Sequence, residues 1–390
     1  MQIQEVQVRL RQAGIDGWLL YDFQGINPIA RKLLGLAGNM ITRRWYFWIP
    51  TSGSPVAFCH RIEQQAFSSL GARVSTFRSW QEMMSGLEHL LTGPRRIAME
   101  YSHSCSIPYV SRVDAGTIEL VRSFGKEVVS SADLVQYFEA RWSAQQFQMH
   151  QEASRRLMKI FFDTLAGIRQ AIRTRILITE YSVQQKMLGM YREAGLKTSS
   201  PPIIAAKQNS ANPHYEPIHE GSAAIEPGDL LLLDFWAKLD EKNSVYADYT
   251  WMAFLGEAVP EPIQKIWEIV RGARDAAIHH VKSNYGKASD LQGWQVDAVS
   301  RDYITQRGYG EFFIHRTGHN IGEEDHGNGA NMDSLETKDE RLLISNTCFS
   351  IEPGIYIKNF GIRSEVNVYL NDEQAVVTGD PIQNEILKLF

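Results

Sequence analysis

Hydrophobic and polar positions divide the chain into two regions with different patterns. In the first region, a helix-like pattern over residues 3–13 is followed by an apolar strand signal at residues 17–21. Two strand-like runs come next, residues 45–49 and 55–59, separated by a short polar turn. Helix and strand signals continue to alternate up to about residue 130, which predicts an α/β domain over residues 1–142.

The second region, residues 143–390, begins with two helix patterns. The first is long and amphipathic, from residue 143 to residue 172, and the second follows Thr179 and ends at Gly195. Further strand signals lie at residues 203–206, 230–236 and 246–255, with helix patterns at residues 261–281 and 291–306 and a strand-rich remainder. This order predicts an α+β domain.

Composition excludes several classes of protein. The 390 residues are 44% hydrophobic and 22% charged, which is typical of a globular chain and excludes disorder as the main state. A net charge of −5 offers no basic field, so we expect no nucleic-acid partner. No apolar run reaches the roughly 18 residues of a membrane span, and the first residues do not form a secretory signal. We therefore expect no membrane partner and a cytoplasmic location.

Acidic residues interrupt two apolar strand patterns in the second region. Asp234 follows the apolar residues 230–233, and Asp248 precedes the apolar run at residues 249–255, with a polar segment between the two strands. This pattern predicts a hairpin with one acid on each arm. A carboxylate within an apolar strand is costly unless it is paired, hydrogen-bonded or bound to a metal. Each aspartate taken alone also fits a strand end or a turn.

A second pair of acids occurs near the end of the chain. Glu352 and Glu365 lie in two strand-like runs on either side of a turn at residues 358–360. If Tyr356 pairs with Gly361, the two glutamates fall opposite each other on one face. Two adjacent carboxylates repel, and a shared proton or a cation relieves the repulsion. Either glutamate alone also fits an exposed strand position.

Histidines are clustered between these two pairs. His315, His319 and His326 fall within twelve residues, in a chain with eleven histidines, and His214 lies in a turn-like stretch before Asp234. A lone histidine is more often structural, but the glycines among these residues allow close approach of the backbone to a site. Four carboxylates and one imidazole suit two divalent ions of the Mn, Co, Fe or Zn type, which is the equipment of metal-assisted hydrolysis.

The local text around these residues resembles a known family. The strings His-x-x-Gly-His-x-x-Gly at residues 315–322, Ser-Ile-Glu-Pro-Gly at 350–354 and Gly-x-Arg-x-Glu at 361–365 are similar to the pita-bread metallopeptidases, in the aminopeptidase P and prolidase branch of the creatinase-like family. The resemblance covers the whole chain. It implies a creatinase-type α/β N-terminal domain followed by an α+β pita-bread catalytic domain.

The resemblance also implies the cofactor and its ligands. Two divalent metal ions per subunit are expected, Mn²⁺ first and Co²⁺, Zn²⁺ or Fe²⁺ as alternatives. The implied ligands are Asp234, which holds one metal, Asp248 and Glu365, which bridge both, and His319 and Glu352, which complete the other. Glu352 is also the implied general base, taking a proton from the attacking water.

Four further site residues are implied by the same resemblance. His214, His315 and His326 match histidines that serve proton transfer, the oxyanion and substrate positioning, and Arg363 matches an arginine that orients ligands or substrate. The implied partners are small peptides with proline at the second position and a second copy of the chain in a homodimer. The implied reaction is hydrolysis of the bond between the N-terminal residue and proline, as in an Xaa-Pro aminopeptidase.

Several alternatives stay open. Some prolidases carry an arginine shortly after the histidine that His326 matches, to bind a dipeptide's carboxylate, but residues 327–330 contain none here, which weighs against an Xaa-Pro dipeptidase. Arg341 is the next arginine and is expected at the surface. The same fold hosts hydrolases and lyases of small molecules, as well as metal-free binding modules. Because all five ligands are present, metal-dependent hydrolysis is favoured over both.

The N-terminal domain contains a cationic and aromatic cluster of three consecutive residues. Arg43 and Arg44 precede Trp45. One interpretation is that the arginines reach the site of a partner subunit. The other, which we favour, is a solvated rim beside a packed tryptophan.

Overall fold

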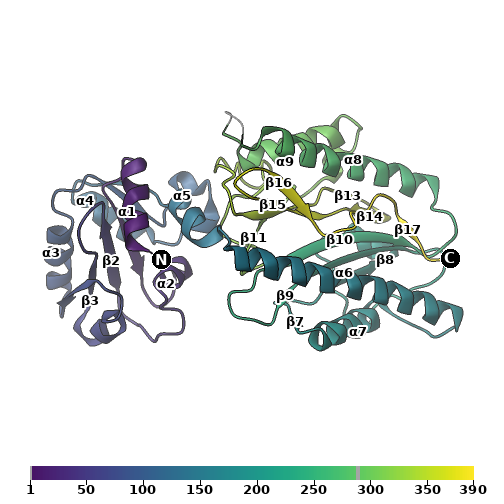
Figure 1. Ribbon diagram of the computed structural model, residues 1–390, viewed down its shortest axis with the longest axis horizontal. Helices are drawn as coiled ribbons and strands as arrows, with labels where there is room; N and C mark the ends of the chain where they lie inside the picture. Colours follow the sequence, from purple (N-terminus) through teal and green to yellow (C-terminus); the bar gives the residue numbers. More distant parts are fainter. Residues whose placement is uncertain (1, 287–289) are drawn as a thin grey trace. The chain divides into compact units, whose positions relative to one another are not determined.

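The computed structural model describes residues 2–286 and 290–390, and the chain divides into two compact units, Met1–Glu139 and Ala140–Phe390 (Figure 1). The boundary expected from the sequence, between residues 142 and 143, lies three residues further along the chain. Within the described ranges, none of the helices combines the length and the apolar character that crossing a membrane requires.

The first unit is built on a six-stranded sheet. The strand order is β4 (Arg73–Phe77), β3 (Val56–His60), β2 (Trp45–Pro50), β1 (Gly17–Asp22), β5 (Arg96–Met99) and β6 (Glu127–Ser130). β2 runs antiparallel to both of its neighbours, while the β3–β4, β1–β5 and β5–β6 pairs are parallel. The expected hairpin of residues 45–49 and 55–59 is the β2–β3 pair.

Helices cover both faces of this sheet because successive strand residues point to opposite sides. Trp18 and Leu20 of β1 pack with α1 (Ile3–Gln12), α2 (Pro28–Leu33) and α5 (Ala132–Val135). Leu19 and Tyr21 pack on the other face, with α3 (Trp80–Leu90) and α4 (Ala115–Ser123). The α/β character predicted for the first domain is therefore confirmed.

The second unit opens with the two expected helices. α6 (Ala144–Arg173) begins at Ser143, whose hydroxyl accepts from the Gln146 amide at 3.2 Å while the Gln146 side chain accepts from the Ser143 amide. α7 (Glu180–Glu193) begins in the same way at Thr179. These reciprocal bonds satisfy amide groups that a helix start leaves without partners, and they explain why the sequence signals located both starts closely.

A central sheet, antiparallel except for one strand pair, follows these helices. Its longest pair is β9 (Leu230–Leu239) with β10 (Ala247–Phe254), and β7 (Leu196–Lys197), β8 (Ile203–Ala206) and β17 (Leu387–Lys388) pair along it. The β10–β17 pair is the parallel one. Figure 1 shows α6 lying along this sheet, and apolar residues of α6 and α7 pack onto the odd-numbered positions of β9 and β10. The even-numbered apolar positions pack instead with α8 (Glu261–Asn284).

The end of the chain forms a second strand layer. β11 (Asn320–Ile321), β12 (Cys348–Ile351), β15 (Val366–Leu370) and β16 (Ala375–Thr378) make one sheet, and β13 (Gly354–Ile357) pairs with β14 (Phe360–Arg363) in another. Apolar residues of α8, β12 and β15 form a shared core there, next to α9 (Gly293–Thr305). The predicted α+β character of the second domain is confirmed.

Candidate metal centre

The two expected aspartates lie on one face of the β9–β10 hairpin. Asp234 is directly opposite Thr250, and Asp248 is opposite Trp236, so the aspartates are diagonal neighbours on the same side. This is the even-numbered side, which continues from Leu232 toward α8. Both aspartates are buried, as a carboxylate inside a central strand must be. The predicted hairpin with an acid on each arm is present.

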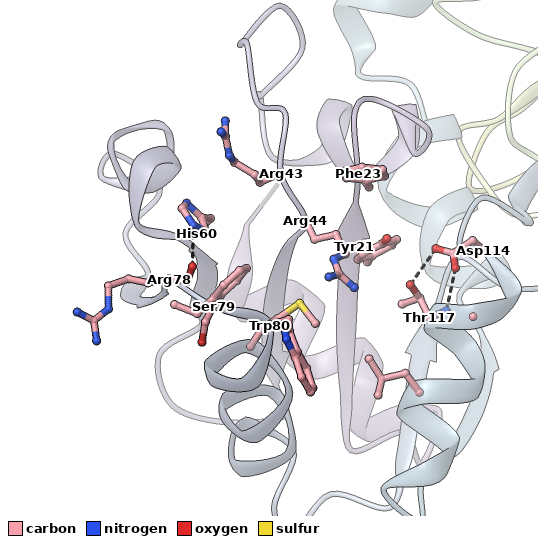
Figure 2. A pocket seen from close by; sticks show the side chains of 14 residues that line it. Tyr21, Phe23, Arg43, Arg44, His60, Arg78, Ser79, Trp80, Asp114 and Thr117 are labelled. Atoms are coloured by element: carbon pink, nitrogen blue, oxygen red, sulfur yellow. Dashed lines mark hydrogen bonds between the residues drawn. The ribbon is translucent and has the colours of Figure 1, made fainter.

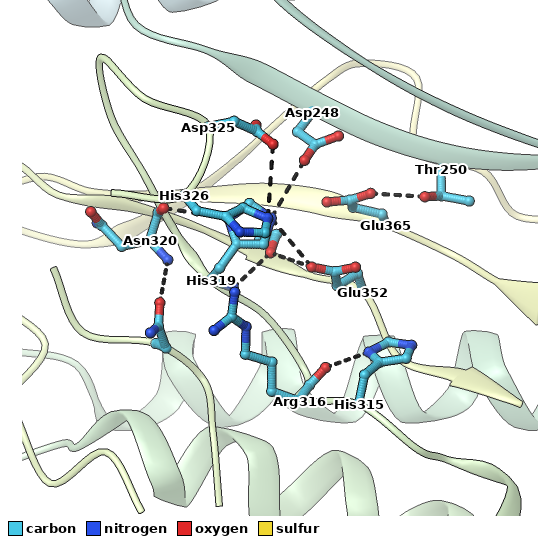
Figure 3. Close-up of polar contacts among 12 residues, drawn as sticks. Asp248, Thr250, His315, Arg316, His319, Asn320, Asp325, His326, Glu352 and Glu365 are labelled. Atoms are coloured by element: carbon cyan, nitrogen blue, oxygen red, sulfur yellow. Dashed lines mark hydrogen bonds and ion pairs between the residues drawn. The ribbon is translucent and has the colours of Figure 1, made fainter. Parts of the chain in front are cut away.

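Glu352 and Glu365 are also brought together, although not by one continuous hairpin. Tyr356 pairs with Gly361 as expected, and Ile351 pairs with Val366, so the same register runs through both ladders. Between the two ladders the chain leaves regular pairing, and Glu352 donates its amide to Thr317 at 2.7 Å while Glu365 donates to Thr250 at 3.2 Å. The break lets both glutamates face the aspartate hairpin (Figure 3).

His319 is positioned by close packing of two backbone segments. A Cβ atom on Gly318 would lie 1.9 Å from the Ser350 carbonyl oxygen, so only glycine allows this approach. The His319 amide donates to the Ser350 hydroxyl at 2.9 Å, and that hydroxyl donates to Glu352 Oε1 at 3.0 Å. One serine thereby holds two expected metal ligands.

Four of the five expected ligands lie close together. His319 Nε2 lies 3.5 Å from Asp248 Oδ2 and 3.4 Å from Glu352 Oε1. Ligand atoms of Asp248, His319 and Glu365 all lie within 4.8 Å of one another, and all three residues are buried. Figure 3 shows these side chains directed toward a common space.

The electrostatics of this cluster call for cations. Burial, together with the neighbouring carboxylates, raises the pKa of Asp248 and Glu365 well above their usual ranges. Within the described residues, Asp248 Oδ1 and Glu365 Oε1 are buried without a hydrogen-bond partner. Buried oxygens of this kind are costly unless something binds them. Four carboxylates and one imidazole fit two divalent metal ions.

Arg363 compensates part of the negative charge. Its Nη2 donates to Asp234 Oδ2, its Nε donates to the Thr250 hydroxyl at 2.9 Å and its Nη1 to the Tyr356 hydroxyl at 3.2 Å. Burial raises the pKa of Asp234, while Arg363, the Thr250 hydrogen bond and His214 oppose that rise. Burial also raises the pKa of Glu352 to about 7, against the opposing charge of Arg363. Arg363 thus orients an expected ligand.

The other expected histidines surround the cluster. His315 Nε2 lies 2.9 Å from the Tyr356 hydroxyl, its Nδ1 lies 2.7 Å from the Arg316 carbonyl, and burial lowers its pKa to about 3. The rings of His326 and His319 are 4.1 Å apart. His214 and His326 are exposed and His315 is partly buried. His315 is therefore neutral at ordinary pH, and His214 and His326 are accessible to solvent.

Sequence reasoning missed three residues that belong to this cluster. Thr250 bonds to Glu365 across 115 residues and Tyr356 bonds to His315 across 41, so no local signal marks these contacts. Asp325 lies within the cluster, beside His319 and His326. Its local signal was the acidic run at residues 323–325 directly before His326.

The expectation for Arg341 was wrong. Arg341 is buried, not at the surface, and binds both carboxylate oxygens of Asp339 at 2.9 and 2.6 Å. It also donates to the Asn328 carbonyl at 2.6 Å. A buried aspartate needs a cation, and that requirement outweighed the usual exposure of arginine in loops.

The arginine cluster of the first unit borders a separate cavity of about 720 Å³ (Figure 2). Its lining includes residues at the carboxyl ends of β1, β3 and β4, and Figure 2 shows Arg44 beside Tyr21. Arg43 and Arg44 are exposed, while Trp45 is buried. This matches the solvated rim beside a packed tryptophan; a role at a partner's site stays a prediction.

Comparison with known proteins extends the similarity over much of the chain. A Xaa-Pro dipeptidase of Lactobacillus delbrueckii subsp. lactis is 35% identical over 201 residues, 51% of this chain and 49% of the relative. The chain therefore spans about half the length of this relative in the match.

Two solved structures share the fold over nearly the whole chain. Dipeptidase PepE from Mycobacterium ulcerans aligns with a TM-score of 0.73 at 21% identity, covering 99% of this chain and 96% of that one. An X-prolyl aminopeptidase from Caenorhabditis elegans, described as having a di-nuclear active site, aligns with a TM-score of 0.68 at 17% identity, covering 99% and 62%. The predicted pita-bread fold with a preceding α/β domain is confirmed.

A family model extends over the centre itself. Residues 148–372, more than half of the chain, match the model of metallopeptidase family M24. That segment contains all five expected metal ligands and the four further site residues. With the convergent carboxylates and His319 already placed, the chain belongs to metallopeptidase family M24.

Proposed function

We propose that this protein is a dinuclear-metal Xaa-Pro peptidase that releases the residue preceding proline from the N-terminus of a peptide. The observation that carries the proposal is the convergence of buried Asp248, His319 and Glu365, with unpartnered oxygens on both acids, inside a segment that matches family M24. Such a set has no structural purpose without cations.

Five residues are proposed to hold the metals: Asp234, Asp248, His319, Glu352 and Glu365. When bound, two divalent ions supply a water of lowered pKa and polarise the scissile carbonyl. Mn²⁺ is the proposed ion because the donor set is dominated by carboxylates, with a single imidazole. Co²⁺, Zn²⁺ and Fe²⁺ share these ligand preferences and are the alternatives to compare with it.

Glu352 is the proposed general base. In the protein without metal, burial raises its pKa to about 7, so the carboxylate is a better proton acceptor than an exposed glutamate. Ser350 holds Oε1 of this carboxylate, and the other oxygen, Oε2, faces Arg363 at 4.0 Å. These two contacts orient the Glu352 carboxylate.

Histidines and the tyrosine define the remaining polar wall. His315, neutral and bonded to the Tyr356 hydroxyl, presents a hydrogen-bonding pair next to Arg363. We propose that this pair supports the oxyanion. The exposed His214 and His326 are proposed to position the substrate backbone and move protons at the entrance.

Aminopeptidase activity is proposed over strict dipeptidase activity. A dipeptidase needs a cation for the free carboxylate of its substrate. Arg341, the next arginine along the chain, is already bound to Asp339 and Asn328, which supports a preference for longer peptides. The dipeptidase name of the bacterial relative keeps Xaa-Pro dipeptides as the second candidate substrate.

The test compares matched peptides. Metal-stripped protein is loaded with Mn²⁺, Co²⁺ or Zn²⁺ and given Xaa-Pro-Yaa, Xaa-Pro and Xaa-Ala-Yaa, with Glu352→Gln as the blank and its metal content measured alongside. We expect cleavage of Xaa-Pro-Yaa, weak cleavage of Xaa-Pro, none of Xaa-Ala-Yaa, and a loss of about 10²–10⁴-fold in Glu352→Gln. Fully metallated protein that leaves both proline peptides intact would contradict the proposal.

The assembly is tested separately. The resemblance supports a homodimer, so sedimentation of the purified protein is expected to give twice the 44.3 kDa mass of one chain. A species with the mass of a single chain at assay concentrations would contradict it.

A further inference from the structure

We propose that Asp325 is an additional carboxylate ligand of the metal centre, beside the five residues named above. The inference rests on the proposed dinuclear centre. It adds a fifth carboxylate to the centre. This carboxylate comes from the loop before His326, whereas the other four acids come from two strand pairs. It predicts a centre with one more negative charge than two divalent ions neutralise.

The geometry places Asp325 among the ligands. Its carboxylate, His319 and His326 offer ligand atoms that lie within 4.8 Å of one another. Its carboxyl group is also within hydrogen-bonding range of Asp248, an expected bridging ligand. Figure 3 shows Asp325 and Asp248 side by side, both directed toward the histidines. Two carboxylates in contact repel unless a cation lies between them or a proton is shared.

The Asp325 carboxylate is not satisfied by the protein itself. Oδ1 of Asp325 is buried without a hydrogen-bond partner, a state it shares with Asp248 Oδ1 and Glu365 Oε1 in the described part of the chain. The nearest histidine nitrogen, His326 Nε2, is 3.9 Å from Oδ2, too far for a hydrogen bond. Asp248 and Glu365 are more than nine-tenths buried, and their unpartnered oxygens belong to the same centre.

Structural acids in the same unit are compensated differently. Asp297 receives both nitrogens of the Arg301 fork at 3.0 and 2.9 Å and the Thr317 hydroxyl at 2.7 Å. Asp339 receives the Arg341 fork at 2.9 and 2.6 Å. Two further buried acids, Glu180 and Asp333, receive backbone amides and uncharged side-chain donors in place of an arginine. Each of these structural acids is thus satisfied by donors of the protein itself. Asp325 has the environment of the metal ligands and not that of the structural acids.

The loop that carries Asp325 is held at both ends, so its position is set by the backbone. The Gly322 carbonyl accepts from the Tyr246 amide at 2.9 Å, which joins the loop to the segment entering β10. The Gly327 amide donates to the Asn320 carbonyl at 2.8 Å, and a Cβ on Gly327 would lie 2.3 Å from Asn320 Oδ1. The side chain of Asp325 therefore faces the centre through a constrained loop.

The chain offers a matched control for charge. Asp325→Asn keeps the size of the side chain and removes its charge. Glu324→Gln removes one charge from the adjacent, exposed position. Any effect of overall charge on metal binding is common to both variants. Only the loss of a ligand is specific to Asp325→Asn.

Metal affinity is measured by titrating Mn²⁺ into apo-protein in competition with a fluorescent chelator, and no peptide is present. We expect Asp325→Asn to weaken the binding of at least one Mn²⁺ by about 10–100-fold, the range seen when a group supporting a metal site is removed. Glu324→Gln is expected to stay within about threefold of the wild type. Equal affinities in the two variants would overturn the proposal. That result is also the one expected if Asp325 only shares a proton with Asp248 and does not bind metal.

Thermal melting separates a ligand from a structural residue. Removing a carboxylate that repels Asp248 raises the melting temperature of the apo-protein, whereas the increase on adding Mn²⁺ becomes smaller than in wild type. A structural Asp325 would lower the apo melting temperature and leave the metal-induced increase unchanged, which would overturn the proposal. If wild-type protein binds two Mn²⁺ but cleaves no proline peptide, the proposed function is contradicted. The inference about Asp325 is then still decided by the measured Mn²⁺ affinities.

Discussion

The Thr250 hydroxyl lies 2.9 Å from Oδ1 of Asp234, the residue directly opposite on the neighbouring strand. The same hydroxyl oxygen is 2.9 Å from Glu365 Oε2 and accepts from Arg363 Nε at 2.9 Å. One side chain thus links two proposed metal ligands and the arginine that compensates them. A hydroxyl has a single proton, so it orders this group by donating to one carboxylate at a time.

Replacing Thr250 tests this link. Thr250→Val has nearly the same shape but no hydroxyl, so both carboxylates lose a contact and Arg363 loses an acceptor. We expect Mn²⁺ affinity to fall about 10–100-fold. Thr250→Ser retains the hydroxyl and is the control, with an affinity close to wild type. Chelator competition measures both, and a Thr250→Val affinity as high as that of Thr250→Ser would contradict a role for the hydroxyl.

Two glycines of the histidine motif are expected to differ in tolerance. A Cβ on Gly318 would lie 1.9 Å from the Ser350 carbonyl oxygen, whereas one on Gly322 would lie 3.8 Å from the Glu324 carbonyl, an ordinary contact. Gly318→Ala therefore forces two backbone segments apart at His319, with an expected loss of about 1–3 kcal/mol in stability and a lower metal content. Gly322→Ala should leave both nearly unchanged. Urea unfolding and metal analysis check the pair, and similar losses in both variants would contradict the steric explanation.

A buried acid in the first unit predicts a pH effect on stability. Glu100 is fully buried and accepts from Trp18 Nε1 at 2.6 Å, Asn27 Nδ2 at 2.7 Å and the Ser131 hydroxyl at 3.0 Å. Burial raises its pKa to about 7 in spite of these hydrogen bonds. The folded unit therefore keeps a proton that the unfolded chain releases at a pH near 4.5.

The sign of the effect follows from proton linkage. Between pH 4.5 and 7 the folded state binds more protons, so stability is highest at the acidic end and falls as pH rises, by on the order of 3 kcal/mol at most. Glu100→Gln does not titrate and should lack this contribution. Hydrogen exchange of β1 amides, compared between the two proteins at pH 5 and pH 8, measures it. A difference between the proteins that does not change with pH would contradict the raised pKa.

Removing the metals should destabilise the second unit at neutral pH. Without cations, the carboxylates of Asp248, Glu352 and Glu365 repel in a buried site. Metal that binds only the folded state adds about 2.7 kcal/mol at a concentration one hundred times its Kd. We therefore expect chelation to lower the melting temperature and Mn²⁺ to restore it. Mg²⁺ serves as the control because it keeps its waters and prefers few protein ligands. An unchanged melting temperature after verified metal loss would contradict this.

The sequence by itself determined much of the local organisation. Side-chain groups at Ser143 and Thr179 mark helix starts because they satisfy amides within three residues. The pairing of Tyr356 with Gly361 could be predicted because a short turn sets the register of its strands. Glu352 and Glu365 lie in the break between this ladder and the next one. Alternation in the β9 and β10 segments put Asp234 and Asp248 on one face for the same reason.

Only the tertiary structure decided how these local pieces meet. Thr250 bonds to Glu365 across 115 residues, Tyr356 joins His315 across 41, and Asp325 approaches Asp248 from another loop. Arg341 was expected at the surface but is buried against Asp339. Such contacts depend on which elements pack together, and that packing cannot be predicted from the residues adjacent in the chain. Local motifs therefore predicted the candidate ligands, while long-range packing decided which groups lie beside them.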